Sequence, residues 1–252
     1  MSRTRMFASF RQRSYELEHL DTGDYTAAEY EGCLVELRRV NRWLGDAHAL
    51  KATLLPELRR ARLQEFSLLD VGAGSGELLR VAAREARREG RRAQLVGLEL
   101  NARSARAIME ESSGLAEIGA VRGDALRLPF ADGAFDYVVC SLFTHHFCDD
   151  GVRRVLGEMA RVARRRVLVI DLHRHALAYF LYTTAGKVFL RNRLVRADGA
   201  LSIRRGFKAD ELRRLAAEAG LRGVEVRRRF PFRLALSGSV SLATEGTEIT
   251  EG

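Results

Sequence analysis

The sequence predicts an α/β fold, a doubly wound and mostly parallel sheet flanked by helices. From Phe66 onward, short continuous apolar runs bounded by turn residues alternate with helical segments. Such runs are typical of strands buried on both faces of a parallel sheet, and the alternation predicts βαβ units. A glycine-rich turn follows the first run directly, at a place where a backbone can approach a ligand. The runs are FSLLDVG, AQLVGLEL, AEIGAVRGD, FDYVVCSLF and RVLVIDL.

The composition fits one globular domain that covers residues 1–252. Hydrophobic residues make up 46% of the chain and charged residues 30%, which argues against a disordered or membrane-embedded protein. No apolar run is long enough to span a bilayer, and residues 1–21 lack the apolar core of a secretory signal. The three cysteines form neither an even disulfide set nor a CxxC pair, so we expect a reduced, cytoplasmic setting.

A net charge of +9 raises the question of a nucleic-acid partner, because basic surfaces attract phosphate. Only Lys51, Lys187 and Lys208 among the 42 basic residues are lysines, and the arginines are scattered along predicted helices beside glutamates. This pattern is typical of a solvated helical surface. We therefore do not expect a nucleic-acid partner, although the arginine runs at 161–167 and 224–230 leave a binding patch open.

Residues 1–62 predict helices that form an N-terminal cap or lid on the sheet. Thr26 and Glu29 have the spacing of a capping box, in which the two side chains satisfy free backbone N–H groups at a helix start. Gly45 ends this first helix, and a second is predicted over 46–62. The apolar positions are Leu34, Leu37, Val40, Trp43 and Leu44 in the first helix, and Leu50, Leu54, Leu55 and Leu58 in the second.

Residues 63–240 are expected to form the ligand-binding core. Within it, the stretch 173–206 is aromatic and irregular, and we predict that it is an insertion facing the functional site. A helix over 208–219, with Gly220 at its C-cap, precedes the strands RGVEVRRRF and FRLALSG, which bring the predicted strand number to seven. The polar tail 241–252 is expected to fray.

The glycine loop excludes two common nucleotide-binding motifs. A dinucleotide fingerprint needs G-x-G-x-x-G/A, but counting from Gly72 the sixth position is Glu77, whose carboxylate would lie close to a pyrophosphate. A P-loop is excluded because no GK[ST] follows. The spacing present is G-x-G-x-G, formed by Gly72, Gly74 and Gly76.

In their order along the chain, these segments resemble the class I S-adenosylmethionine (SAM) dependent methyltransferases. D-V-G-A-G-S-G resembles motif I of that family, Glu99 ends the second strand, GDALRLPF follows the third, and DGAFDYVVCSLFTHHF carries the fourth. The resemblance covers about residues 66–175, and its order and spacing are also similar to the menaquinone and ubiquinone methyltransferase group. It implies the class I methyltransferase fold and SAM as the cofactor.

The resemblance also implies which residues contact SAM. The glycine loop would lie against the methionine and ribose portion with Asp70 nearby, Glu99 would accept both ribose hydroxyls, and Asp124 with the backbone of Ala125 would hold the adenine edge. Asp124 could equally be a turn aspartate, and the apolar neighbours Leu100 and Leu126 could equally be core residues. The full predicted set is Asp70, Gly72, Ala73, Gly74, Gly76, Glu99, Leu100, Asp124, Ala125, Leu126 and Ser141.

Four histidines follow the fourth and fifth predicted strands, at the sheet edge where ligands bind in such folds. His146, His145 or His173 could act as a general base that removes a proton from a phenol or enol acceptor. Alternatively, the adjacent pair could be a loop feature that only lines the pocket. A metal site is the least favoured interpretation, because no acidic or cysteine partner is fixed by the sequence, and we predict none. Asp171 and Arg174 could orient the acceptor or a histidine.

The stretch 176–190 is rich in aromatic residues and indicates a flat, lipophilic or aromatic acceptor, because the corresponding segment of this superfamily commonly contacts the acceptor. It could also be a core helix, or a helix that lies on a membrane surface. The sequence carries no information about oligomeric state.

The leading functional prediction is a small-molecule methyltransferase of secondary metabolism that acts on a phenolic or polyketide-like hydroxyl. A second possibility is carbon methylation of a quinone precursor or lipid. A third is an RNA methyltransferase or nucleic-acid binder. The third lacks the [DNS]-PP-[YFW] tetrapeptide of amino-methylating enzymes, because the fourth strand ends C-S-L-F.

Overall fold

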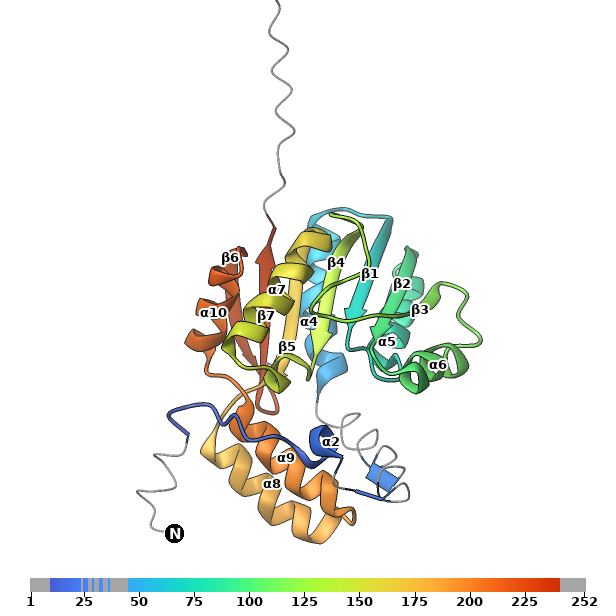
Figure 1. Ribbon diagram of the computed structural model, residues 1–252. Coiled ribbons are helices and arrows are strands. Elements are labelled where there is room, and N and C mark those ends of the chain that lie inside the picture. The colour runs from blue at the N-terminus through green and yellow to red at the C-terminus, as the bar shows by residue number, and fades with distance from the viewer. Residues whose placement is uncertain are drawn as a thin grey trace, which may run out of the picture.

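The computed structural model describes residues 10–23, 25, 26, 29, 32, 33, 36 and 45–240. Seven strands form one sheet in the order β3-β2-β1-β4-β5-β7-β6, and only β7 runs antiparallel to its neighbours. This is the mostly parallel, seven-stranded sheet that the sequence predicts (Figure 1). The strands are β1 (Glu65–Val71), β2 (Arg92–Glu99), β3 (Ile118–Arg122), β4 (Phe135–Ser141), β5 (Ala163–Leu172), β6 (Arg222–Arg229) and β7 (Arg233–Ser239).

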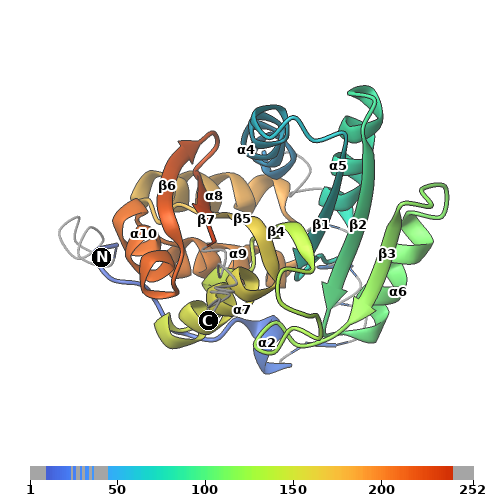
Figure 2. The ribbon, with the colours of Figure 1, turned by 90° about the horizontal axis from the view of Figure 1, so that it is seen from above.

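Helices cover both faces of the sheet, as the view from above shows (Figure 2). One face packs against α4 (Asp46–Arg60), α5 (Glu77–Arg88) and α6 (Ala102–Glu111), whose apolar sides share one core cluster. The other face packs against α7 (Asp149–Val162) and α10 (Ala209–Glu218). Because α4 packs on α5, β5 and β7, it is a core helix and not part of the predicted lid.

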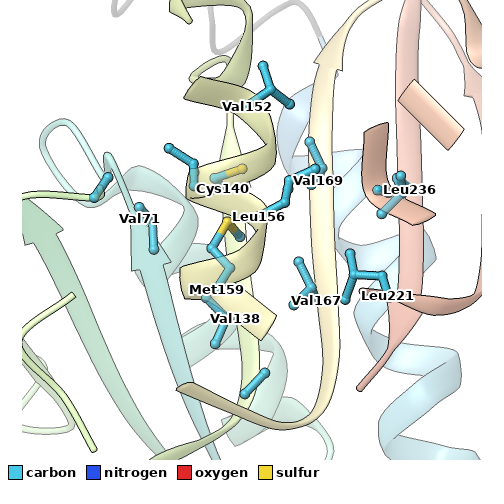
Figure 3. Packing of buried hydrophobic residues seen from close by; sticks show 14 of the residues in the cluster. Val71, Val138, Cys140, Val152, Leu156, Met159, Val167, Val169, Leu221 and Leu236 are labelled. Carbon is cyan, nitrogen blue, oxygen red and sulfur yellow. The ribbon is translucent and has the colours of Figure 1, made fainter. Parts of the chain in front are cut away.

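The strands are apolar because the sheet is buried from both sides. Every residue of β4 from Phe135 to Cys140 is buried. Side chains of β4 and β5 interdigitate with the apolar stripe of α7, formed by Val152, Leu156 and Met159 (Figure 3). This two-sided burial explains why the runs are continuous rather than alternating.

The stretch 173–206, predicted to be irregular, folds mainly as the two helices α8 (Ala176–Phe189) and α9 (Arg193–Arg205). They pack side by side: the Tyr182 hydroxyl donates to the carbonyl of Val195 at 2.5 Å, and Gly199 leaves room for the Tyr182 ring, which a Cβ at that position would overlap. Figure 1 shows both helices beyond the carboxyl ends of the parallel strands. None of the helices in the described ranges has the length and apolar content needed to cross a bilayer.

The N-terminal region departs from the predicted helices. Residues 13–18 have no regular secondary structure, and the helix that follows them, α2 (His19–Thr22), is only 4 residues long. The capping box is confirmed, since the backbone N of Thr26 donates to Glu29 Oε2 at 2.9 Å and the backbone N of Glu29 donates to Thr26 Oγ1 at 3.3 Å. The predicted apolar stripe 34–44 and the tail 241–252 lie outside the described residues.

Candidate active site

The glycine loop is fastened to the end of β2. The backbone N–H groups of Gly72 and Ala73 both donate to the carbonyl of Leu98, at 2.9 and 3.2 Å. Gly72 has φ +70, and a Cβ there would lie 2.4 Å from the ring of Phe143. Only glycine therefore fits at this position, which also shows that Phe143, absent from the predicted site, packs directly on the loop.

A cavity of about 620 Å³ lies beside this loop. Asp70 at the end of β1 and Ser141 at the end of β4 both line it. Within the described part of the chain, Asp70 Oδ1 and Ser141 Oγ are buried without a hydrogen-bond partner. Since buried polar atoms are nearly always paired, two such atoms at one cavity indicate a place for a polar ligand. The other lining residues include Gly72, Ala73, Gly74, Ser75, Leu142, Asp46, Glu77, Arg103, Ser104, Glu110 and Glu111.

The cavity wall is suited to a cationic ligand. Burial, together with the nearby charge of Glu99, raises the pKa of Asp70 to about 8. A positively charged group beside Asp70 would relieve both effects, because it favours the ionised carboxylate. These carboxylates therefore fit SAM, which carries an ammonium and a sulfonium but no phosphate.

Glu99, the last residue of β2, forms a hydrogen bond with the glycine loop. Its Oε1 accepts a hydrogen bond from the backbone N of Gly74 at 2.6 Å. Burial raises the pKa of Glu99, although backbone N–H groups of Gly74, Leu100 and Asn101 partly oppose this effect. The Glu99 carboxylate thus contacts the glycine loop, and its predicted contact with the ribose hydroxyls stays a prediction.

The predicted adenine-side residues lie away from this cavity's lining. Asp124 is exposed, and its Oδ1 accepts from the backbone N of Leu126 at 2.8 Å, as a turn aspartate does. Ala125 is buried in the core cluster, whereas Leu100 is exposed. Gly76 precedes α5, and a Cβ there would meet Ile108 at 3.1 Å.

The first histidine of the pair is held by an aspartate. His145 is buried, and its Nδ1 lies 2.7 Å from Asp171 Oδ1. Burial lowers the pKa of His145 below its ordinary value, so the ring is neutral near pH 7, with Nδ1–H donating to Asp171 and Nε2 left as an acceptor. Burial alone would raise the pKa of Asp171, but the His145 ring and the hydroxyl of Thr144, 2.6 Å away, hold it below its usual range.

The second histidine lies beside the first and beside a glutamate from the N-terminal segment. The ring centroids of His145 and His146 are 4.2 Å apart, and His146 Nδ1 lies 3.8 Å from Glu18 Oε2. Ligand atoms of Glu18, His145 and His146 all lie within 4.8 Å of one another, a spacing that could admit a metal ion.

His173, the third predicted base, belongs to a different cluster. It is buried next to His175, with ring centroids 5.4 Å apart, and His175 contacts Phe232. Burial and the positive charges of Lys208 and other basic groups lower the pKa of His173 to about 4. The structure therefore brings together His145, His146 and Asp171, and places His173 apart from them.

Two buried arginines that the sequence did not single out bind the histidine turn, which is formed by residues 144–147. The Arg205 guanidinium donates to the carbonyls of His145 and His146, at 3.1 and 2.5 Å. Arg13 donates to the carbonyl of Phe147 at 3.0 Å and pairs with Asp149 at 2.7 Å. In a chain with so many arginines, no local pattern distinguishes these two.

Arg174 is a structural residue in this arrangement. Its fully buried guanidinium donates to the carbonyls of Phe10, Gly206 and Arg11 and pairs with Glu211 at 2.5 Å. It therefore fastens the N-terminal segment to the end of α9 rather than facing the cavity.

Comparison with known proteins supports the predicted fold. Residues 68–166 match the family described as "Methyltransferase domain". Over 115 residues the chain is 30% identical to the uncharacterized methyltransferase YcgJ of Bacillus subtilis, a match that spans 42% of this chain and 41% of that relative. The match therefore covers less than half of the length of this curated relative.

Similar solved structures span the sheet and its helices. A SAM-dependent methyltransferase from Aquifex aeolicus superposes with a TM-score of 0.56 at 16% identity, covering 79% of this chain and 96% of that one. The SAM-bound magnesium protoporphyrin IX methyltransferase of Synechocystis gives 0.54 at 14% identity, with 79% and 81% covered. A putative O-methyltransferase from Nostoc punctiforme gives 0.58 at 16% identity, with 82% and 59% covered.

Proposed function

We propose that the chain contains a class I SAM-dependent methyltransferase domain and that it methylates a small, lipophilic or aromatic acceptor, with a phenolic or polyketide-like hydroxyl as the favoured target. The observation that carries the proposal is the pair of buried, unpartnered oxygens on Asp70 and Ser141 at one cavity beside the glycine loop. When bound, SAM supplies a methyl group already activated by its sulfonium.

The cofactor-binding roles follow from the chemistry of each position. Asp70 would accept from the SAM ammonium, which removes the cost of its buried, unpaired oxygen. Glu99 would accept from the ribose hydroxyls, and the backbone of Gly74, which is exposed, would lie against the cofactor. Asp124 would hold the adenine edge with its second carboxylate oxygen, because its Oδ1 already accepts from the backbone N of Leu126.

The acceptor hydroxyl needs a proton acceptor as it attacks the methyl group. We assign this role to the pair His145 and His146, with Asp171 as the positioning residue that fixes the tautomer of His145. The lowered pKa of His145 keeps its ring neutral, and therefore able to take a proton, near pH 7. The acceptor class is inferred from the apolar and aromatic composition of α8, which packs on α9, the helix that contacts this turn.

The proposal is tested by incubating the full chain with methyl-labelled SAM and separate panels of phenols, quinone precursors and RNA. We expect label in phenols, on oxygen, and none in RNA. A Glu99→Ala variant serves as the control for enzyme-dependent transfer, since it should lose labelling at limiting SAM. Label found on carbon of the quinone precursors would favour C-methylation instead, and label found only in RNA would overturn the proposal.

A further inference from the structure

The helix α8 carries an apolar surface that the rest of the described protein leaves uncovered. Its inner side packs within the protein. The Tyr182 hydroxyl donates a hydrogen bond to α9, Gly186 lies against Leu190, and the ring centroids of Tyr179 and Phe10 are 5.5 Å apart. On the outer side, five large apolar residues are between 48% and 77% exposed. They are Leu177, Phe180, Leu181, Val188 and Phe189.

These residues form a stripe rather than a scatter. Leu177, Leu181 and Val188 are separated by 4 and 7 positions, so they lie along one line of the helix, with Phe180 beside that line. An apolar stripe on a helix whose other side is already packed marks an interaction surface. With 14 residues, the helix can lie along a membrane surface but not cross one.

The basic residues around the stripe favour a negatively charged partner. The sequence from Leu172 to Ala197 contains no aspartate or glutamate, whereas Lys187, Arg191 and Arg196 are exposed near the stripe's end and on the adjoining helix. The ion pairs recorded among the described residues involve none of these three side chains. Nearby, Glu29 pairs with Arg193, and Glu36 accepts from the backbone N–H groups of Arg191 and Asn192.

We propose that α8, with Lys187, Arg191 and Arg196, docks the protein on the surface of an anionic lipid bilayer. The apolar side chains enter the boundary between headgroups and acyl chains, and the basic side chains contact lipid phosphates. Figure 1 shows α8 at the same end of the molecule as the carboxyl ends of the parallel strands. A docked molecule would therefore hold its site near the bilayer, where a lipophilic acceptor partitions.

This proposal goes beyond methyl transfer and is tested without it. The full chain is sedimented with vesicles of phosphatidylcholine alone and with vesicles that also contain phosphatidylglycerol, at low and high salt. We expect binding to the phosphatidylglycerol vesicles that weakens as salt rises. Lys187→Ala and Arg196→Ala should each weaken it about fivefold, because each basic residue near such a surface contributes about 1 kcal/mol.

Variants of the stripe separate docking from loss of folding. Leu181→Glu combined with Val188→Glu should abolish vesicle binding while the affinity for SAM is retained. Met109→Glu, at a residue on α6 that is 48% exposed, is the matched control and should bind vesicles as the wild type does. Absence of binding to phosphatidylglycerol vesicles, or equal binding by the stripe variant, would overturn the proposal. So would a self-association that the stripe variant removes in the absence of vesicle binding, because α8 would then pair with a second copy.

Discussion

At the scale of single residues, Asp70 is the most informative side chain. It is buried at the end of β1, and its unpartnered oxygen makes its ionisation depend on what occupies the cavity. The pKa of about 8 means that much of the free protein holds Asp70 protonated near neutral pH. A cationic ligand needs the carboxylate, so ligand binding and proton release are coupled.

We predict that SAM affinity rises with pH up to about 8 and then levels off, because below this pH binding must first displace a proton from Asp70. Titration calorimetry across this range, in buffers of different ionisation enthalpy, measures both the affinity and the proton release. Asp70→Asn should bind more weakly and release no proton at this site. A wild-type protein that releases no more protons than Asp70→Asn would contradict the assignment.

The same pKa shift has a consequence for stability. A carboxyl group whose pKa is raised by folding stabilises the folded state fully below its unfolded pKa, and this contribution is lost as pH rises toward about 8. In the absence of SAM, the wild type should therefore lose free energy of unfolding relative to Asp70→Asn as pH increases over this interval. Denaturant titration at several pH values gives the difference, and a difference that is independent of pH would be inconsistent with a buried, titrating Asp70.

The histidine pair gives a second prediction for single residues. If one ring accepts the proton of the acceptor hydroxyl, replacing it should lower kcat by about 10² to 10⁴ without a matching loss of SAM affinity. His145→Ala, His146→Ala and Asp171→Asn are compared by steady-state kinetics as a function of pH. Asp171→Asn should shift the pH profile, because Asp171 controls the His145 tautomer, whereas unchanged turnover in both histidine variants would remove the base assignment.

Predicted site residues that belong to contiguous motifs line the same cavity. Asp70, Gly72 and Ser141 meet at the cavity, because their spacing follows from strands whose ends align in a parallel sheet. Phe143 and the two buried arginines were not anticipated. The contacts of Arg13 join positions more than 100 residues apart in the sequence, and no local pattern encodes such a pair.

At the scale of elements, the N-terminal segment acts as a strap over the histidine turn. The extended stretch around Arg13 runs beside α9, where Ser14 N–H bonds the carbonyl of Arg204 and Glu18 accepts from Ser202 at 2.7 Å. The helical prediction was wrong for residues 13–18, which have no regular secondary structure, because these tertiary contacts outweigh the local propensity.

Removing the buried Arg13 side chain of the strap should lower the free energy of unfolding. Arg13→Ala leaves the carbonyl of Phe147 without its donor and removes the buried one of the two arginines that pair with Asp149, so we expect the free energy of unfolding to fall by about 2–4 kcal/mol. The exposed Arg11→Ala is the matched control and should change it by less than about 0.5 kcal/mol. Denaturant unfolding measures both, and equal effects of the two variants would show that the strap does not hold the turn.

The helices α8 and α9 show why no clear element could be predicted between β5 and α10. In α8 the inner face is apolar because it packs on α9, and the outer face is also apolar, so no polar stripe reveals the helical period. Tyrosine, threonine and glycine in its middle lower helix propensity further. The same outer apolar face is the surface that we propose for lipid docking.

At the scale of the whole molecule, the net charge of +9 does not produce an unpaired arginine run at 161–167. In the run at 161–167, Arg161 pairs with Asp132 and Glu158, Arg164 and Arg165 with Asp136, and Arg166 with Glu57. We therefore predict weak binding to generic RNA, with a shallow dependence on salt. Filter binding over a range of salt concentrations provides the slope, and a steep slope would indicate many phosphate contacts and a nucleic-acid partner.

The sheet itself was predictable from the sequence because parallel strands buried on both faces leave an unmistakable alternation of apolar runs and helices. The acceptor was not predictable, because α8, α9 and the N-terminal strap lie outside residues 68–166, which match the methyltransferase domain. We propose that these added elements determine which acceptor is bound.

We propose that the glycine loop binds SAM together with Asp70 and Glu99. Calorimetric titration of SAM into the wild type, Glu99→Ala and the control Glu117→Ala tests this binding directly. Glu117 forms a surface ion pair with Arg87, so its replacement should leave SAM affinity unchanged. We expect saturable binding of SAM by the wild type that Glu99→Ala weakens by about tenfold or more, since a charge-assisted hydrogen bond to the ribose is lost. No SAM binding by the wild type, or equal affinity in Glu99→Ala, would contradict it.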